Sequence, residues 1–248
     1  MNLLLENKTV FITGASSGIG AAAARVFAEE GAHVALSYHH NQPGAETAAG
    51  AVRALGRQAA LVPIDLADPL AIRAAAETLP APFDALDVLV LCAGMNVITP
   101  IEQITPEEWE TVMAVNLNGP FYLLQGLAPR VREGGSIVTV ASVAAHTGNA
   151  AHPHYAAAKA GLVNLTKSFA RALAPRVRVN CVAPGITLTP MGRETAASLP
   201  PDYAHKKLLA GRYAEPEEIA RWIVFVASPA AGFMTGATVD VNGGRELR

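Results

Sequence analysis

Short apolar runs rich in β-branched residues recur along the chain, and longer stretches with helical periodicity separate most of them. The apolar runs predict strands over 9–13, 33–37, 59–64, 87–92, 136–141, 177–183 and 237–241. The periodic stretches, rich in Ala, Leu, Glu and Arg, predict helices over 18–30, 44–56, 69–79, 106–132, 155–174 and 218–228. Alternation of this kind is typical of an α/β fold with a parallel sheet and helices on both faces.

No linker rich in Pro, Gly or Ser and no internal repeat divides the chain, so we predict a single domain over 1–248. The one long break in the periodic pattern is 186–216, which is polar and contains prolines. An insertion of this length predicts a lid or a mobile loop, and we expect its 186–213 part to line a substrate pocket.

Composition narrows the class of partner. The 248 residues are 51% hydrophobic and 16% charged, which is typical of a compact globular protein. A net charge of −2 with no block of like charges gives no footprint for nucleic acid or for anionic lipid. We therefore expect a small, nearly neutral partner.

The two cysteines and the chain start bear on cellular location. Cys92 and Cys181 lie in apolar stretches, where a free thiol behaves as a small hydrophobe, and no disulfide is expected. The opening "MNLLLENK" lacks the basic region of a signal peptide, and the longest apolar run, "DVLVLCAGM", is too short to cross a bilayer. These features predict a cytoplasmic protein with no membrane partner.

Glycines gather after the first predicted strand, in "TVFITGASSGIG", where Gly14, Gly18 and Gly20 precede a helix. Such glycines let the backbone turn sharply toward a pyrophosphate, whose charge the helix N-terminus meets. The spacing is G-x-x-x-G-x-G rather than the commoner G-x-G-x-x-G. The turn favours dinucleotide binding, and an ordinary glycine-rich connection is the simple alternative.

The end of the second strand bears on which dinucleotide is bound. An acidic residue there would bind the ribose of NAD, but this chain has Tyr38 and His39, so no carboxylate of this segment repels a 2′-phosphate. The segment favours NADP(H) over NAD(H), although no Arg or Lys at Ser17 or over 37–42 is placed to hold that phosphate. Solvated loop residues remain an alternative for the two neighbouring histidines. Without Cys, Asp or Glu partners at ligand spacing, the following residues predict no metal site: His39, His40, His152 and His154.

"HPHYAAAKAGL" (152–162) places Tyr155 and Lys159 one helical turn apart, so both side chains can reach one bound molecule. Taken alone, such a pair is more commonly packing and solvated surface. Ser142 follows the fifth strand and Asn116 lies in the long helix before it, and each alone is more commonly a cap. Their joint placement in one glycine-turn fold favours a catalytic site.

Eight motifs in one order carry a resemblance that covers essentially the whole chain: "TGASSGIG" (13–20), Asp65-Leu66, "CAG" (92–94), "VNLNG" around Asn116, "VASVAA" around Ser142, "YAAAK" (155–159), "APGIT" (183–187) and "TGATVDVNGG" (235–244). In these motifs the sequence resembles the short-chain dehydrogenases/reductases. That resemblance implies a doubly wound Rossmann fold with a seven-stranded parallel sheet and NAD(P)(H) across the carboxyl ends of the strands.

The resemblance also assigns residues to the cofactor. The contacts it implies come from Gly14, Ser16, Ser17, Gly18, Ile19 and Gly20 at the diphosphate, from Asp65 and Leu66 at the adenine, from Cys92, Ala93 and Gly94 beside the adenosine, and from Pro184, Gly185, Ile186 and Thr187 at the nicotinamide. Where the family usually has Asn, this chain has Cys92. A thiol is a poorer hydrogen-bond partner than an amide, so we expect weaker stabilisation of that strand end.

The reaction implied is hydride transfer between nicotinamide and a carbonyl or secondary alcohol, with Asn116, Ser142, Tyr155 and Lys159 as the catalytic set. Tyr155 would supply the proton, and the charge of Lys159 is expected to lower the pKa of that phenol. Lys159 would also bind the nicotinamide ribose, and Ser142 would hold the carbonyl oxygen. Asn116, by the same resemblance, fixes a helix irregularity and a water that relays protons to Lys159.

Several alternatives stay open. The chain resembles both 3-oxoacyl-carrier-protein reductases and sugar or polyol dehydrogenases, and a catalytically silent dinucleotide-binding regulator or scaffold is the alternative from another class. The enoyl reductase branch has a wider Tyr-to-Lys gap, and the lyase and epimerase branches are longer. Basic residues of the insertion leave an anionic substrate open. The family implies a homotetramer, for which the apolar helix 218–228 suits an interface, although Trp222 and Phe225 could equally be core.

Overall fold

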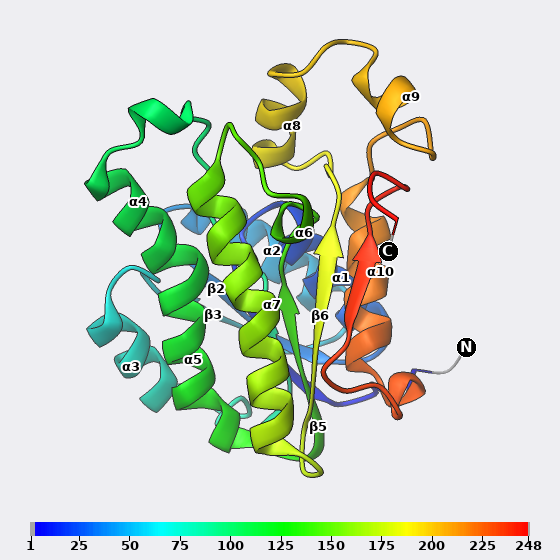
Figure 1. Ribbon diagram of the computed structural model, residues 1–248. Helices are drawn as coiled ribbons and strands as arrows, with labels where there is room; N and C mark the ends of the chain where they lie inside the picture. Colours follow the sequence, from blue (N-terminus) through cyan, green and yellow to red (C-terminus); the bar gives the residue numbers. More distant parts are fainter. Residues whose placement is uncertain (1–2, 248) are drawn as a thin grey trace.

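A single parallel sheet organises the computed structural model, which describes residues 3–247 (Figure 1). The strand order is β3-β2-β1-β4-β5-β6-β7, which confirms the predicted doubly wound, seven-stranded α/β fold. The strands are β1 (Thr9–Thr13), β2 (His33–Tyr38), β3 (Ala59–Pro63), β4 (Leu86–Leu91), β5 (Val131–Val140), β6 (Arg178–Pro184) and β7 (Thr238–Val241). Because the order reverses between β1 and β4, the carboxyl ends of these two strands are where a ligand crevice forms.

Helices cover both faces of this sheet. They are α1 (Gly18–Glu29), α2 (Gln42–Ala54), α3 (Pro69–Glu77), α4 (Pro106–Met113), α5 (Gly119–Leu127), α6 (Ala144–Thr147), α7 (Pro153–Leu173), α8 (Pro190–Ala197), α9 (Tyr203–Lys207) and α10 (Pro216–Ala227). Single 3₁₀ turns lie at Ile101–Gln103, Ala128–Arg130 and Pro229–Ala231. Side-chain caps at Asn41, Asp68, Thr105 and Thr189, each followed by Pro in the first turn, explain where four of the helices begin.

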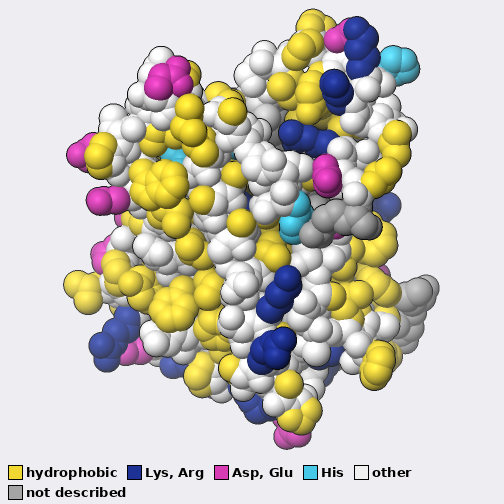
Figure 2. Space-filling model, viewed as in Figure 1, with side chains coloured by type: hydrophobic (Ala, Val, Ile, Leu, Met, Phe, Trp, Pro, Cys, Tyr) yellow, Lys and Arg dark blue, Asp and Glu magenta, His cyan; other side chains and the backbone are white. Residues whose placement is uncertain are grey.

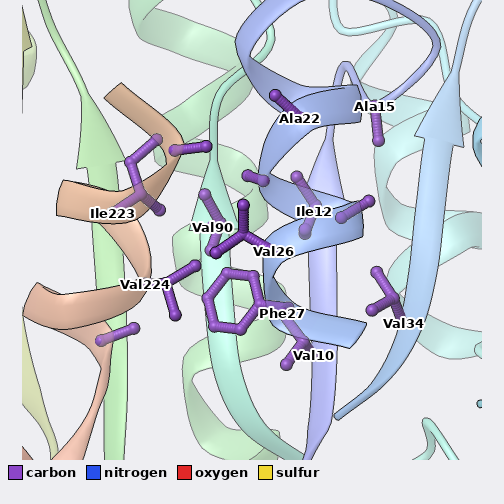
Figure 3. Close-up of a cluster of buried hydrophobic side chains, with 14 of the residues drawn as sticks. Val10, Ile12, Ala15, Ala22, Val26, Phe27, Val34, Val90, Ile223 and Val224 are labelled. Atoms are coloured by element: carbon purple, nitrogen blue, oxygen red, sulfur yellow. The ribbon is translucent and has the colours of Figure 1, made fainter. Parts of the chain in front are cut away.

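The alternation of side chains along each strand builds two cores. On β1, Val10 and Ile12 join the cluster under α1, α2 and α10, whereas Phe11 joins the cluster under α3, α5 and α7. Figure 3 shows the first cluster, with Phe27 of α1 lying between the central strands and Val224 of α10. Both faces of the sheet are therefore buried, which is why the strands read as continuous apolar runs.

The predicted helix over 106–132 is wrong at its end. Helix α5 stops at Leu127, and β5 begins at Val131 rather than at residue 136. Val131 is buried and pairs with Leu86, and the ladder then shifts register before Val88. Two glycines, 134 and 135, interrupt the apolar run of β5, so the sequence pattern hides the first part of this strand.

The insertion before the last helix forms a closed arm, residues 186–213, rather than a free loop. It carries α8 and α9 beyond the carboxyl edge of the sheet (Figure 1). Its base is fastened because Leu188 donates to the Ala214 carbonyl at 2.8 Å and Ala214 donates to the Ile186 carbonyl at 3.1 Å. Among the described helices, none is both long and apolar enough to cross a membrane.

Candidate active site

The carboxyl ends of the strands open into a cleft of about 840 Å³, a volume typical of small-molecule sites. Its walls come from the glycine turn, the ends of β4, β5 and β6, the start of α7 and the arm. In Figure 2 the molecule is hollowed between the lobe that carries α4 and the lobe that carries α8 and α9. The cleft thus lies at the predicted place in the fold.

The turn between β1 and α1 admits only glycine at its key positions. Gly14 has φ +67°, and a Cβ there would lie 2.7 Å from the Ala93 Cα atom. Gly18 has φ +54°, and a Cβ at Gly20 would lie 2.4 Å from the Gly14 carbonyl oxygen. Left-handed backbone and close packing therefore require glycine at these positions of the turn.

Helix α1 begins at this turn with its positive end toward the cleft. Ser17 is the N-cap, but its side chain makes no capping hydrogen bond, and no acidic residue lies in the first turn. Asn41 fixes the turn from outside by donating to the Ser16 carbonyl at 3.2 Å. Backbone N–H groups and a helix dipole that no side chain neutralises are what a diphosphate needs.

The end of the cleft beside β2 and β3 holds a carboxylate that the sequence of β2 does not reveal. His39 Nε2 lies 3.6 Å from Asp65 Oδ2, and both side chains are partly exposed. We expected that no carboxylate within residues 37–42 would repel a 2′-phosphate. Asp65, from the loop after β3, brings a carboxylate to His39, so that expectation considered too short a part of the chain. Tyr38 does not line the cleft; it pairs with Pro63 at the end of β2.

A threonine, not the residue at position 92, holds the end of β4. The Thr13 hydroxyl accepts hydrogen bonds from the N–H groups of Cys92 and Ala93, each at 3.0 Å. These bonds do not involve the Cys92 side chain. The weaker stabilisation expected from a thiol at position 92 therefore does not affect these backbone hydrogen bonds. Burial raises the pKa of the Cys92 thiol to about 12, which keeps it protonated.

Asn116 lies behind the cleft wall rather than in it. It is fully buried in a π-helical turn, Ala114–Asn118, that joins α4 to α5. Its amide donates to the carbonyls of Val112 and Met95, both at 2.9 Å, and accepts from the Met95 N–H at 3.2 Å. The helix irregularity expected at this residue is present, and the side chain fixes the loop after β4.

Tyr155 and Lys159 project from one face of α7 into the cleft, as predicted. The Lys159 ammonium, almost fully buried, donates to the Val140 carbonyl at 3.0 Å and lies 5.6 Å from the centre of the Tyr155 ring. Burial lowers the pKa of Lys159 to about 8. Burial also raises the pKa of Tyr155 to about 12, against a smaller lowering by a hydrogen bond with Ser142.

The expected lowering of the tyrosine pKa by Lys159 is not found in the chain alone, where loss of hydration on burial is the largest influence and raises that pKa. Tyr155 is protonated at neutral pH, and Lys159 is mostly charged there. This combination suits a group that donates a proton to a bound oxygen, with a cation nearby to stabilise the phenolate that forms.

The structure brings together most of the predicted site. All the predicted cofactor residues except Tyr38 line the cleft, and so does Ser142. Sequence reasoning assigned no role in the site to Asn96, His152 or Arg245, which also line it. His152 lies within a turn of Tyr155 and so carried a signal, whereas nothing in the pattern marked Arg245 near the chain end. Residues 3–247 contain no group of three or more His, Cys, Asp or Glu side chains that could hold a metal ion.

Comparison with known proteins agrees with this geometry. A family model described as enoyl-(acyl carrier protein) reductase matches residues 14–246. A D-threitol dehydrogenase of Mycolicibacterium smegmatis is 37% identical over 98% of this chain and 95% of its own. An L-rhamnose 1-dehydrogenase (NAD(P)⁺) of Sphingomonas sp. is 38% identical over 97% of each chain.

Among solved structures, a short-chain dehydrogenase from Burkholderia cenocepacia in complex with NADP superposes with a TM-score of 0.92 and 32% identity, covering 98% of this chain and 99% of the other. The fold, the cleft and these matches together define an NAD(P)-dependent oxidoreductase. The chain belongs to the short-chain dehydrogenase/reductase family.

The glycine turn generates a first prediction. Gly14→Ala forces a side chain into left-handed backbone against Ala93 and should lower the free energy of unfolding by about 2 kcal/mol or more. Gly50→Ala is the matched control, because nothing lies within 4 Å of a Cβ on Gly50 in α2, and it should raise stability by about 0.5–1 kcal/mol. Urea unfolding measures both, and equal effects would contradict the steric argument.

Proposed function

We propose that the protein transfers hydride between NADP(H) and a carbonyl or secondary alcohol of a small molecule, with Tyr155 as general acid and base. The observation that carries this proposal is the shared face of α7: Tyr155 and the buried Lys159 ammonium border one cleft, which Ser142 also lines. A protonated phenol beside a fixed cation is matched to an oxygen that gains or loses a proton.

The residues present fit the dinucleotide. The glycine turn and the open start of α1 would hold the diphosphate, and residues 184–187 at the end of β6 would face the nicotinamide. Lys159 has three N–H donors and one protein acceptor, the Val140 carbonyl, so donors remain for ribose hydroxyls. When bound, the nicotinamide supplies or accepts the hydride.

The chain's own residues then manage the oxygen and its proton. Ser142 and Tyr155 would hold the carbonyl oxygen, and Tyr155 would donate its proton as negative charge develops there. Lys159 would stabilise the resulting phenolate. In the oxidative direction the tyrosine must first lose its proton, which its high pKa opposes in the chain alone.

Replacement of the tyrosine tests this role. Tyr155→Phe should lower turnover of any good substrate at least about 100-fold, because the proton donor is lost, while thermal stabilisation by NADP⁺ is kept. Ser168→Ala, which removes an exposed hydroxyl from the same helix, is the control and should retain full turnover. Normal turnover by Tyr155→Phe would refute the assignment. A wild-type chain that binds NADP⁺ but turns over no ketone or alcohol in a broad panel would point to a silent regulator.

We propose NADP(H) as the preferred dinucleotide. The absence of a carboxylate at the end of β2 supports it, as does the NADP complex of a structural relative. The name of the rhamnose dehydrogenase relative covers both dinucleotides. Asp65 opposes the preference, because its carboxylate lies beside His39 at the same end of the cleft.

A thermal-shift comparison tests the preference for NADP(H) and the opposing effect of Asp65. NADP⁺ should raise the unfolding temperature more than NAD⁺ at equal concentration. Asp65→Asn removes the negative charge and should widen the difference between NADP⁺ and NAD⁺. Asp68→Asn, at the N-cap of α3, is the control: it should lower the unfolding temperature of the free protein and leave that difference unchanged. Larger stabilisation of the wild type by NAD⁺ would reverse the proposed preference.

We propose that residues 1–248 act as one dinucleotide-binding domain in which the arm 186–213 serves as a substrate lid. Met191 and Leu199 of the arm line the cleft, which supports this role. The four-residue step from Tyr155 to Lys159 supports carbonyl rather than enoyl reduction. A polyol, a sugar and a 3-oxoacyl thioester remain candidate substrates on these grounds.

We also propose a homotetramer located in the cytoplasm. Trp109, Phe121 and Tyr122 are partly exposed on α4 and α5, a region where Figure 2 shows hydrophobic side chains, and Trp222 is partly exposed on α10. Exposed aromatic clusters of this kind suit interfaces between copies. Both cysteines are free, which suits a reducing compartment. Sedimentation equilibrium should give four chain masses, and a monomer would contradict the assembly.

A further inference from the structure

Two polar side chains that line the cleft each have a buried atom without a hydrogen-bond partner among the described residues. His152 is 7% exposed and occupies the N-cap of α7, yet its side chain makes no capping bond. Among the residues that the structure describes, no group bonds its Nδ1 atom, which is buried. The buried Oδ1 atom of Asn96 is likewise unpaired in the described chain. Both residues line the cleft.

The two loops that carry these residues form one wall of the cleft. Thr99 donates its N–H to the Ala151 carbonyl at 2.9 Å, which joins the loop of Asn96 to the loop of His152. The first loop is also fixed at Met95 by the Asn116 amide. The His152 ring lies edge-on to the Tyr155 ring, with centroids 5.6 Å apart. Both unpaired groups therefore stand on fixed backbone at the cleft, and His152 lies next to the proposed proton donor.

The charge state of the histidine limits what it can bind. Burial, with smaller contributions from the charges of His154 and Arg245, lowers the pKa of His152 to about 4. The ring is neutral at neutral pH, so one nitrogen donates and the other accepts. The Asn96 amide also offers one donor group and one acceptor. A half-turn exchanges the two in the amide, and a change of tautomer exchanges them in the imidazole. Together they present a neutral polar pair, not a charged one.

Buried polar groups without partners destabilise a protein unless something pairs with them. A hydroxyl group is both donor and acceptor, so it can pair with the imidazole or the amide in either orientation. The methylene chain of an acyl thioester can pair with neither. Both side chains line the cleft, so a rotation of each can present its polar groups to a substrate that carries hydroxyls next to its reacting carbon.

We infer that His152 and Asn96 select substrates that carry hydroxyl groups adjacent to the reacting carbon, namely polyols, sugars and hydroxy ketones, over simple alcohols and acyl thioesters. This inference rests on the proposed function, whose substrate class it names. Neither residue moves the proton; each binds the part of the substrate that does not react.

Matched substrates test the selection. D-threitol and xylitol are oxidised with NADP⁺ and compared with butan-2-ol and pentan-2-ol, which have the same chain lengths but one hydroxyl, and acetoacetyl-coenzyme A is reduced with NADPH. For the wild type, kcat/KM of at least one polyol should exceed that of its matched alcohol by at least about 100-fold, because the alcohol leaves the polar pair unsatisfied.

Variants of His152 and Asn96 then test whether these two residues cause the preference for polyols. His152→Phe should lower kcat/KM of that polyol at least about 10-fold and leave the matched alcohol within about twofold. His152→Gln, which keeps a donor and an acceptor, should recover part of the loss, and Asn96→Leu should act as His152→Phe does. Asn164→Leu, on the exposed side of α7, should change neither rate. Unfolding temperature and stabilisation by NADP⁺ show whether each variant is folded.

The possible outcomes distinguish failure of this inference from failure of the proposed oxidoreductase function. If the wild type prefers the simple alcohols or acetoacetyl-coenzyme A, the substrate class is wrong and the oxidoreductase proposal stands. If folded His152→Phe and Asn96→Leu lower polyol and alcohol rates equally, the selective role is wrong. If the wild type turns over no compound while NADP⁺ still stabilises it, the proposed function fails and the inference falls with it.

Discussion

The buried ammonium of Lys159 is the interaction on which the site depends. A charge taken out of water must be hydrogen-bonded, and here the Val140 carbonyl at the end of β5 accepts that bond at 3.0 Å. The bond fixes α7 to the carboxyl edge of the sheet and thereby sets where Tyr155 stands. Glycine at position 94 keeps this region open, since a Cβ there would lie 2.7 Å from the Asn116 Oδ1 atom and 3.2 Å from Nζ.

Around that ammonium, three segments far apart in sequence hold one another. Asn116 departs from regular α-helix in a π-helical turn, and its amide bonds the backbone of Met95. Thr13 holds the preceding end of β4 through two N–H groups. Each of these side chains bonds main chain rather than another side chain, so the positions of the strand ends are fixed by groups that do not themselves meet the substrate. The Cys92 side chain takes no part in the bonds from Thr13, so those bonds do not depend on the side chain at position 92.

Sequence patterns predicted the parts of this protein that regular structure determines. Buried strands and glycine-only positions leave strong signals, and they located the strands of the sheet and the glycine turn. Helical spacing located the face shared by Tyr155 and Lys159. The patterns failed where tertiary contacts override them. Residues 131–135 pair with β4 despite two glycines, Asp65 reaches His39 from another loop, and burial raises the pKa of Tyr155 where a nearby cation was expected to lower it. None of these follows from local spacing.

The same distinction separates the class of reaction from the choice of substrate. The groups proposed to handle hydride and proton stand at strand ends and on α7, which the two cores hold rigidly, so short motifs suffice to recognise them. The groups that would contact the rest of a substrate lie on the loops of Asn96 and His152 and on the arm, where many sequences fit one backbone. A substrate class can therefore be argued only from atoms left without partners in the folded chain. His152 and Asn96 carry that argument because burial makes their unpaired state costly, whereas exposed polar residues such as those of α9 are satisfied by water and indicate nothing.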